Sequence, residues 1–154
     1  MIVFNGEYEA TIDSKGRFLL PGGLKKQMPE GDNRFMISRG LERCLNLYPI
    51  KTWESVIEEI LKKNKFDPKV REFQRKFLGG ATLVEIDSAG RLLMPPSLRE
   101  HAELGKDIIL AAIGDKIEIW DSGKYKKFFE EFSAEDFSKL AEEVMTGKSN
   151  GVSD

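Results

Sequence analysis

A pattern of nine residues occurs twice in this chain and divides it into two related halves. Residues 13–21 read DSKGRFLLP, and residues 87–95 read DSAGRLLMP. Two copies of so specific a pattern in 154 residues indicate an internal duplication. We expect the halves, residues 1–80 and 81–147, to form one compact domain, because about 75 residues alone bury a small core. The polar residues 148–154 are expected to be a disordered tail.

Each part of the pattern predicts a local structure. Asp13 and Asp87 begin turns in which a carboxylate accepts hydrogen bonds from the next backbone amides. Gly16 and Gly90 supply the positive φ that such a turn requires. The apolar triplet predicts a short buried strand. The proline cannot continue that strand and suits the first turn of a helix. The two aspartates and the two glycines are therefore predicted to shape the turns.

Hydrophobic periodicity predicts the same order of elements in both halves: strands around the turn, one helical turn, two more strands and a helix pair. The expected strands are 7–12, 18–20, 34–37, 44–48, 81–86, 92–94, 107–112 and 116–120. The expected longer helices begin at the caps Thr52, Asp67, Asp121 and Ser133. Their predicted buried faces are Trp53, Val56, Ile57, Ile60 and Leu61; Val70, Phe73 and Phe77; Tyr125, Phe128, Phe129 and Phe132; and Phe137, Leu140, Ala141 and Val144. This order indicates an α+β fold that is mainly β.

Catalytic and metal-binding patterns are not found in the sequence. The single cysteine, Cys44, and the single histidine, His101, do not make a zinc site, which needs three or four ligands. Asp13 and Asp87 are a symmetric carboxylate pair but lack the D-[ST]-G triplet of aspartic proteases. We expect no enzyme activity, no cofactor, no metal and no small-molecule substrate. Without a signal sequence or an apolar run of membrane length, a cytoplasmic location is expected.

Two arginines at equivalent turns favour a binding function. Arg17 and Arg91 follow the two glycines, and a guanidinium on a rigid turn suits contacts with phosphate and with guanine. Lys15, Lys25 and Arg99 add positive charge nearby, while Arg39 and Arg43 flank another turn. Alternatively, each arginine only pairs with the aspartate of its own turn. The net charge of −2 argues mildly against nucleic acid, although an acidic chain can carry a local basic patch.

Three segments, in order, resemble the MraZ family. They are the doubled D-x-x-x-R pattern, residues 39–49 (RGLERCLNLYP) and residues 77–81 (FLGGA). The resemblance extends from about Phe4 to Phe132. The D-x-x-x-R turns also resemble the swapped-hairpin DNA-binding domains of the AbrB class. The fold implied by this resemblance is a pseudo-two-fold barrel of two interlocked swapped-hairpin units, of the double-psi type, with helical pairs packed outside.

The resemblance also implies a function. It points to a sequence-specific DNA-binding regulator of the bacterial division and cell-wall gene cluster. A ring-shaped homo-oligomer in the cytoplasm, associated with the nucleoid, would bind direct repeats in double-stranded promoter DNA. The family's DNA contacts carry over to Arg17 and Arg91, and its usual basic turn residue carries over to Lys15. The second copy has Ala89 in place of that lysine, so we expect the first copy to dominate.

The short helix after each proline commonly carries Leu-Arg in the family. Arg99 keeps this arginine and Lys25 replaces it in the first half. Two other functions stay open from the residues. One is a structural or protein-interaction oligomer whose arginine turns seal subunit interfaces. The other is a toxin–antitoxin partner, although such AbrB-class proteins usually have one short β unit and a disordered tail.

Overall fold

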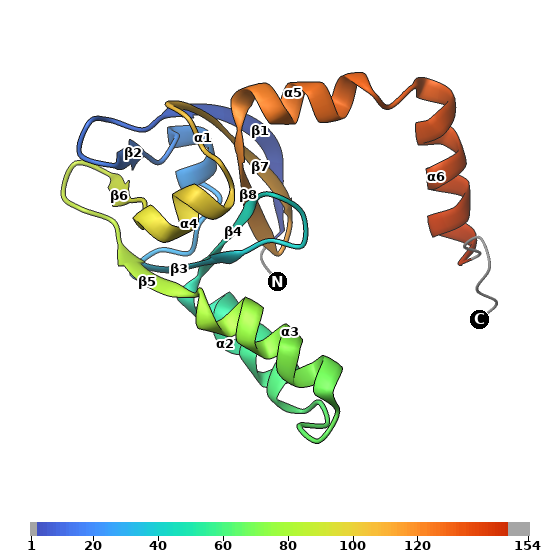
Figure 1. The fold of residues 1–154 in the computed structure, drawn as a ribbon. Coiled ribbons are helices and arrows are strands. Elements are labelled where there is room, and N and C mark those ends of the chain that lie inside the picture. Colours follow the sequence, from blue (N-terminus) through green and yellow to red (C-terminus); the bar gives the residue numbers. More distant parts are fainter. Residues whose placement is uncertain (1–2, 148–154) are drawn as a thin grey trace. The chain divides into compact units, whose positions relative to one another are not determined.

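The computed structural model describes residues 3–147 (Figure 1). Eight strands and six helices follow one another in this part of the chain. The strands are β1 (Phe4–Thr11), β2 (Arg17–Leu19), β3 (Arg34–Arg39), β4 (Leu45–Pro49), β5 (Thr82–Glu85), β6 (Arg91–Leu93), β7 (Asp107–Gly114) and β8 (Lys116–Asp121). The helices are α1 (Gly22–Lys25), α2 (Ile50–Leu61), α3 (Pro68–Gly79), α4 (Pro96–His101), α5 (Ser122–Glu130) and α6 (Ala134–Thr146). The α+β class is confirmed.

Every strand of the first half pairs with a strand of the second half. Six strands form one sheet in the order β1-β7-β8-β4-β3-β5, and β2 pairs with β6 in a separate two-stranded sheet. All these pairings are antiparallel. The strand order is unchanged when equivalent strands of the two halves are exchanged (β1 with β5, β3 with β7, β4 with β8). The duplication in the sequence is therefore expressed as a pseudo-two-fold arrangement.

The expected closed barrel is wrong. β1 and β5 are the two edges of the larger sheet, and no pairing joins them within residues 3–147. Among the described residues, one isolated β-bridge, between Ile12 and Phe18, joins the β2–β6 ribbon to the residue that follows β1. β2 and β6 have three residues each and pair with one another. They therefore cover the core as a separate ribbon and do not close the larger sheet.

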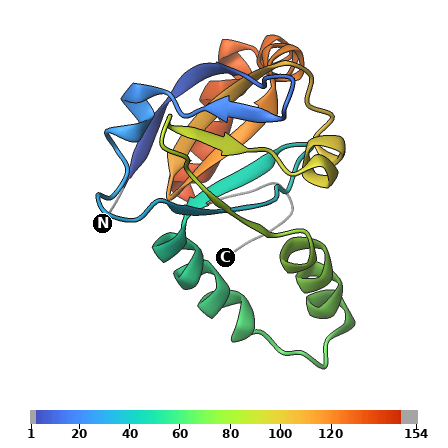
Figure 2. The ribbon, with the colours of Figure 1, turned by 90° about the vertical axis from the view of Figure 1, so that its left-hand side faces the viewer.

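The core lies between the larger sheet and the β2–β6 ribbon, and equivalent residues of both halves fill it. Phe18 and Leu92, in the middle of the ribbon strands, are both buried. The helical turns after the prolines contribute Leu24 and Leu98, which are also buried. In Figure 2 the ribbon strands lie side by side, with a short helix next to each of them. Burial of Phe18 and Leu92 fixes which face of the ribbon points outward, because side chains alternate along a strand.

A second, aromatic cluster joins the α2–α3 hairpin to the sheet. The rings of Trp53 on α2 and Phe77 on α3 stack with centroids 5.5 Å apart, and Tyr48 on β4 lies 5.4 Å from Trp53. The side chain of Asp67 caps α3 by accepting from the amide of Lys69, as the sequence predicted. The predicted cap Thr52 is wrong, because α2 begins earlier, at Ile50.

The chain divides after Ser122 into two compact units, and the second contains nearly all of α5 together with α6. Ser133 and Asp136 form the predicted capping box of α6, and Gly147 ends this helix with a φ of 74°. The predicted inward faces of these helices are wrong, since Phe128, Phe137 and Val144 are 55%, 63% and 67% exposed. Amphipathic periodicity shows which side of a helix is apolar, but it does not show whether another part of the chain covers that side. Among the described helices, none is both long and apolar enough to span a membrane.

Candidate nucleic-acid interface

Asp13 organises the first turn through its side chain and its backbone. Its Oδ1 accepts from the amides of Lys15 and Arg17, each at 2.9 Å. Its carbonyl accepts from the amide of Gly16 at 3.0 Å, and its own amide donates to the carbonyl of Arg17 at 2.7 Å. Gly16 has a φ of 81°, which costs a residue with a side chain about 1–2 kcal/mol. Local hydrogen bonds therefore hold the tip of this turn in one conformation.

The second turn repeats this geometry. Asp87 Oδ1 accepts from the amides of Ala89 and Arg91 at 2.9 and 2.8 Å, and Gly90 has a φ of 82°. The hydrogen bonds that these aspartates accept lower the pKa of both carboxyl groups, with the bond from the arginine amide as the largest cause. Both carboxylates are therefore charged at neutral pH, and their turns are formed under those conditions.

Each turn also holds the strand of the other half. The amide of Met94 donates to the carbonyl of Gly16 at 2.7 Å, and the amide of Leu20 donates to the carbonyl of Gly90 at 3.0 Å. Between these bonds Phe18 lies opposite Leu92 in the ribbon. The two arginine turns are consequently linked to each other, although they lie far apart in the sequence.

Both arginines are paired with an aspartate and still partly exposed. Arg17 Nε lies 3.2 Å from Asp13 Oδ2, and Arg91 Nε lies 3.0 Å from Asp87 Oδ2. The arginine side chains are 29% and 35% exposed. The ion pair of the alternative interpretation therefore exists, but it uses Nε and not the two terminal nitrogens. Those terminal groups make the end-on fork with which arginine binds guanine or phosphate, so pairing and binding are compatible.

The other predicted binding residues have different surroundings. Lys15 is exposed in the first turn, and Lys25 is exposed in the last turn of α1. Arg99 on α4 donates from Nε to the carbonyl of Leu104 at 3.2 Å and from Nη2 to that of Gly105 at 3.3 Å. Its guanidinium thus supports the loop before β7, a contact that the sequence did not reveal.

The arginines that flank the other turn of the first half hold helix ends. Arg39 Nη1 donates to the carbonyl of Lys76 near the end of α3 at 2.9 Å, and Arg43 Nη1 donates to that of His101 at the end of α4 at 3.4 Å. His101 is half-buried, and its pKa is lowered by desolvation and by the charges of Arg39 and Arg43. Arginines at the ends of helices stabilise the exposed carbonyls there, which accounts for these two residues structurally.

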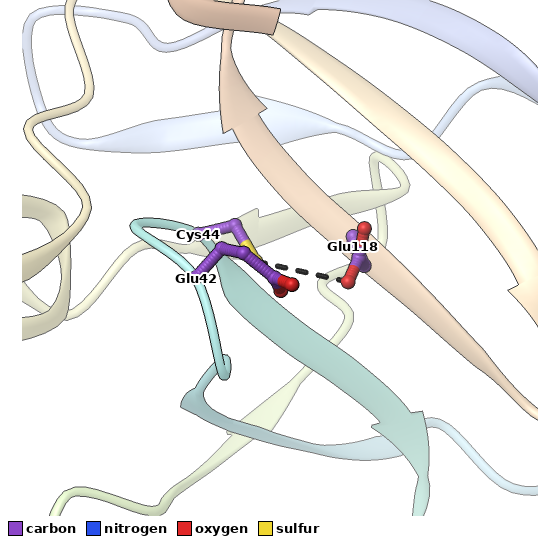
Figure 3. Close-up of side chains that lie close together, drawn as sticks. All are labelled: Glu42, Cys44 and Glu118. Atoms are coloured by element: carbon purple, nitrogen blue, oxygen red, sulfur yellow. Dashed lines mark hydrogen bonds between the residues drawn. The ribbon is translucent and has the colours of Figure 1, made fainter. Parts of the chain in front are cut away.

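Cys44 lies beside two carboxylates, Glu42 and Glu118 (Figure 3). Its Sγ lies 3.8 Å from Glu118 Oε2, in a donor geometry for the thiol. Burial, followed by the charges of Glu118 and Glu42, raises the pKa of Cys44 to about 12. The group is therefore a protonated thiol that donates a hydrogen bond, whereas metals bind the thiolate form.

Leu19 and Leu93 were not predicted as surface residues. The apolar triplets predicted strands buried along their length, yet these two side chains are 57% and 54% exposed. The alternation of side chains in a strand could have predicted this exposure. Because Phe18 and Leu92 point inward, the residues next to them must point outward. The outer face of the ribbon therefore carries Arg17, Leu19, Arg91 and Leu93, which we name the Arg–Leu quartet.

Comparison with known proteins supports the duplication and identifies relatives over nearly the whole chain. The family model described as "MraZ protein, putative antitoxin-like" matches residues 3–76 and again residues 77–147. A protein of Flavobacterium psychrophilum, named transcriptional regulator MraZ, is 43% identical over 91% of this chain and 90% of its own. Proteins of the same name from Cytophaga hutchinsonii and Desulfitobacterium hafniense are each 40% identical. They cover 92% and 82% of this chain, and 94% and 86% of their own.

Proposed function

The chain belongs to the MraZ family, and from this premise we propose that it is a sequence-specific, DNA-binding transcriptional regulator. The observation that carries the proposal is the β2–β6 ribbon, which displays an arginine from each half on its outer face. A two-stranded antiparallel ribbon fits the major groove of DNA, and arginine is the residue that most often reads guanine there.

Each candidate residue has its own part in this proposal. Arg17 and Arg91 contact bases or phosphates with their terminal nitrogens, and Lys15 adds a phosphate contact beside Arg17. Lys25 and Arg99 contribute positive charge next to the ribbon. Asp13, Gly16, Asp87 and Gly90 shape the turns without touching DNA.

The assembly and the target are part of the same proposal. Subunits form a ring whose arginine turns bind direct repeats in the promoter of the division and cell-wall gene cluster, in the cytoplasm at the nucleoid. A ring displays several basic turns together, which gives a positive strip on a protein with a pI of about 5.6. Binding at neighbouring repeats then gains from effective concentration. The ribbon, built from one strand of each half, supports kinship with the AbrB-like swapped hairpins.

The test compares two arginines by gel shift on the DNA upstream of the gene. Arg17→Ala should weaken binding about 5- to 150-fold, the usual range for an arginine that reads a base. Arg34→Ala is a matched control, because Arg34 also pairs with a neighbouring carboxylate, Asp32, at 3.0 Å, and its loss changes the charge equally. Wild-type binding should also fall steeply with salt.

A structural role for the turns gives the opposite result. Arg17→Ala would then change the mass of the oligomer in light scattering and leave DNA affinity unchanged. If the wild-type protein binds the upstream DNA no better than unrelated DNA, the proposed function is wrong.

A further inference from the structure

Two leucines lie on the proposed DNA-binding face. Leu19 and Leu93 are more than half exposed, at 57% and 54%. Each follows a buried residue, Phe18 or Leu92, on the same strand. They occupy the same place in the two copies of the repeated pattern. The apolar surface is thus a repeated feature and not a single exposed side chain.

The register of the ribbon places each leucine beside the arginine of the other half. Arg17 lies opposite Leu93, and Leu19 lies opposite Arg91. The ladder bonds Leu20 N–Gly90 O and Met94 N–Gly16 O flank these pairs, which makes both of them non-hydrogen-bonded pairs. In such pairs the Cα atoms lie roughly 4.5 Å apart and the side chains lie closest together. The Arg–Leu quartet therefore alternates cationic and apolar groups on one small face.

Each leucine also lies close to the glycine of the opposite turn. A Cβ atom built on Gly16 would lie 3.8 Å from Leu93 Cδ1, and one built on Gly90 would lie 3.5 Å from Leu19 Cδ1. Each leucine methyl group therefore lies near the tip of the opposite turn.

We infer that Leu19 and Leu93 contact the C5-methyl groups of thymine, so that the Arg–Leu quartet reads thymine as well as guanine. This inference rests on the proposed function. The thymine methyl is the apolar group that B-DNA displays in the major groove, and apolar side chains distinguish thymine by contact with it. Because each leucine lies beside an arginine, we expect the partner of this apolar surface to be negatively charged DNA and not the dry interface of another protein.

The symmetry of the quartet predicts where these thymines lie. The pseudo-two-fold axis that relates the two halves of the protein also relates Leu19 to Leu93. In the same way, the two-fold axis of a DNA duplex relates its two strands. Diagonal neighbours in a ribbon are about 7–8 Å apart, and base pairs stack about 3.4 Å apart. The two leucines therefore reach thymines on opposite strands, about two base-pair steps apart.

The test removes the methyl groups without changing base pairing. Upstream DNA in which deoxyuridine replaces thymidine is compared with the normal duplex by gel shift, first in full and then one position at a time. We expect about a fourfold loss of affinity for each contacted methyl group. The Leu19→Ala/Leu93→Ala variant should bind more weakly than wild type and should bind the two duplexes equally. Its fold is checked by circular dichroism.

Two results would overturn the inference while the proposed function stands. In one, wild type binds normal and uracil-containing duplexes equally, while Arg17→Ala still weakens binding. In the other, the double leucine variant keeps the full preference for thymine. If wild type shows no sequence-specific binding to the normal duplex, the proposed function fails instead and the inference falls with it.

Discussion

The amide of Met94 donates a 2.7 Å hydrogen bond to the carbonyl of Gly16, and this bond ties the strand of one half to the turn of the other. The equivalent bond joins Leu20 to Gly90 at 3.0 Å. Together with the pairing of every first-half strand to a second-half strand, these bonds make the geometry of each arginine turn dependent on both halves.

The halves should therefore not fold separately. A fragment of residues 1–80 lacks the partners of β1, β2, β3 and β4 from the second half. We expect it to show little sheet by circular dichroism and no cooperative thermal transition, because unpaired strand edges remain. Co-expression with residues 81–154 should restore both signals. A cooperative transition in the isolated fragment would contradict the interlocked arrangement.

The two arginine turns should contribute unequally to DNA binding. Arg91→Ala should weaken binding less than Arg17→Ala. The reason is that the second turn has Ala89 where the first has Lys15, and so it carries one positive charge fewer. Ala89→Lys should strengthen binding and steepen the dependence of log affinity on log salt by about 0.9, the value for one more phosphate contact. Ala89→Gln serves as the uncharged control. Equal losses for the two arginine variants, or an unchanged salt dependence in Ala89→Lys, would show that the lysine is not a contact.

The turns should weaken in acid. The pKa values of Asp13 and Asp87 are lowered, chiefly by the amides of Arg17 and Arg91. A carboxyl group whose pKa is lower in the folded protein stabilises the fold at pH values above its unfolded pKa of 3.8. This stabilisation is lost as the pH falls through the pKa of the folded protein. The Asp13→Asn/Asp87→Asn variant should have a lower Tm than wild type at pH 7, and the difference should shrink below about pH 4.

The control for this experiment is Glu9→Gln, an exposed carboxylate on β1. Its Tm should follow that of wild type across the same range. A Tm difference between wild type and the double variant that stays constant from pH 7 to pH 2 would show that the carboxylate charges do not support the turns.

Cys44 should be unreactive in the folded protein. With its pKa raised to about 12 by burial and by the neighbouring carboxylates, little thiolate is present near pH 8. Its rate of reaction with an aromatic disulfide reagent at pH 8 should be lower than in guanidinium by a factor on the order of 100 to 1,000. Similar rates in the two conditions would mean that the thiol is open to solvent.

Gly40 should resist substitution because of a close contact. A Cβ atom there would lie 2.5 Å from Cys44 Sγ and 2.9 Å from Cys44 O, which is backbone. We expect Gly40→Ala to lower the free energy of unfolding by about 1–3 kcal/mol in urea titrations. Gly79→Ala is the control, since a Cβ at the end of α3 meets nothing within 4 Å. Equal stabilities of the two variants would show that the backbone relaxes around the new methyl group.

Much of the fold followed from short-range patterns in the sequence. The repeated turn, the order of strands and helices, and the caps at Asp67 and Ser133 involve residues a few positions apart, so local hydrogen bonding and backbone preferences are sufficient to predict them. The start of α2 was misplaced for a related reason. Thr52 is a good capping residue, but the chain leaving β4 becomes helical directly after Pro49.

Long-range packing determined the rest of the candidate site. Only the tertiary structure decided that β2 pairs with β6, that the larger sheet stays open, and that Arg99 supports a loop. The sequence by itself determined that two equivalent turns carry Arg17 and Arg91, because glycine and aspartate specify such turns locally. The tertiary structure decided that Leu19 and Leu93 lie outward beside them, because the burial of Phe18 and Leu92 against the shared core selects the face of the ribbon that remains exposed.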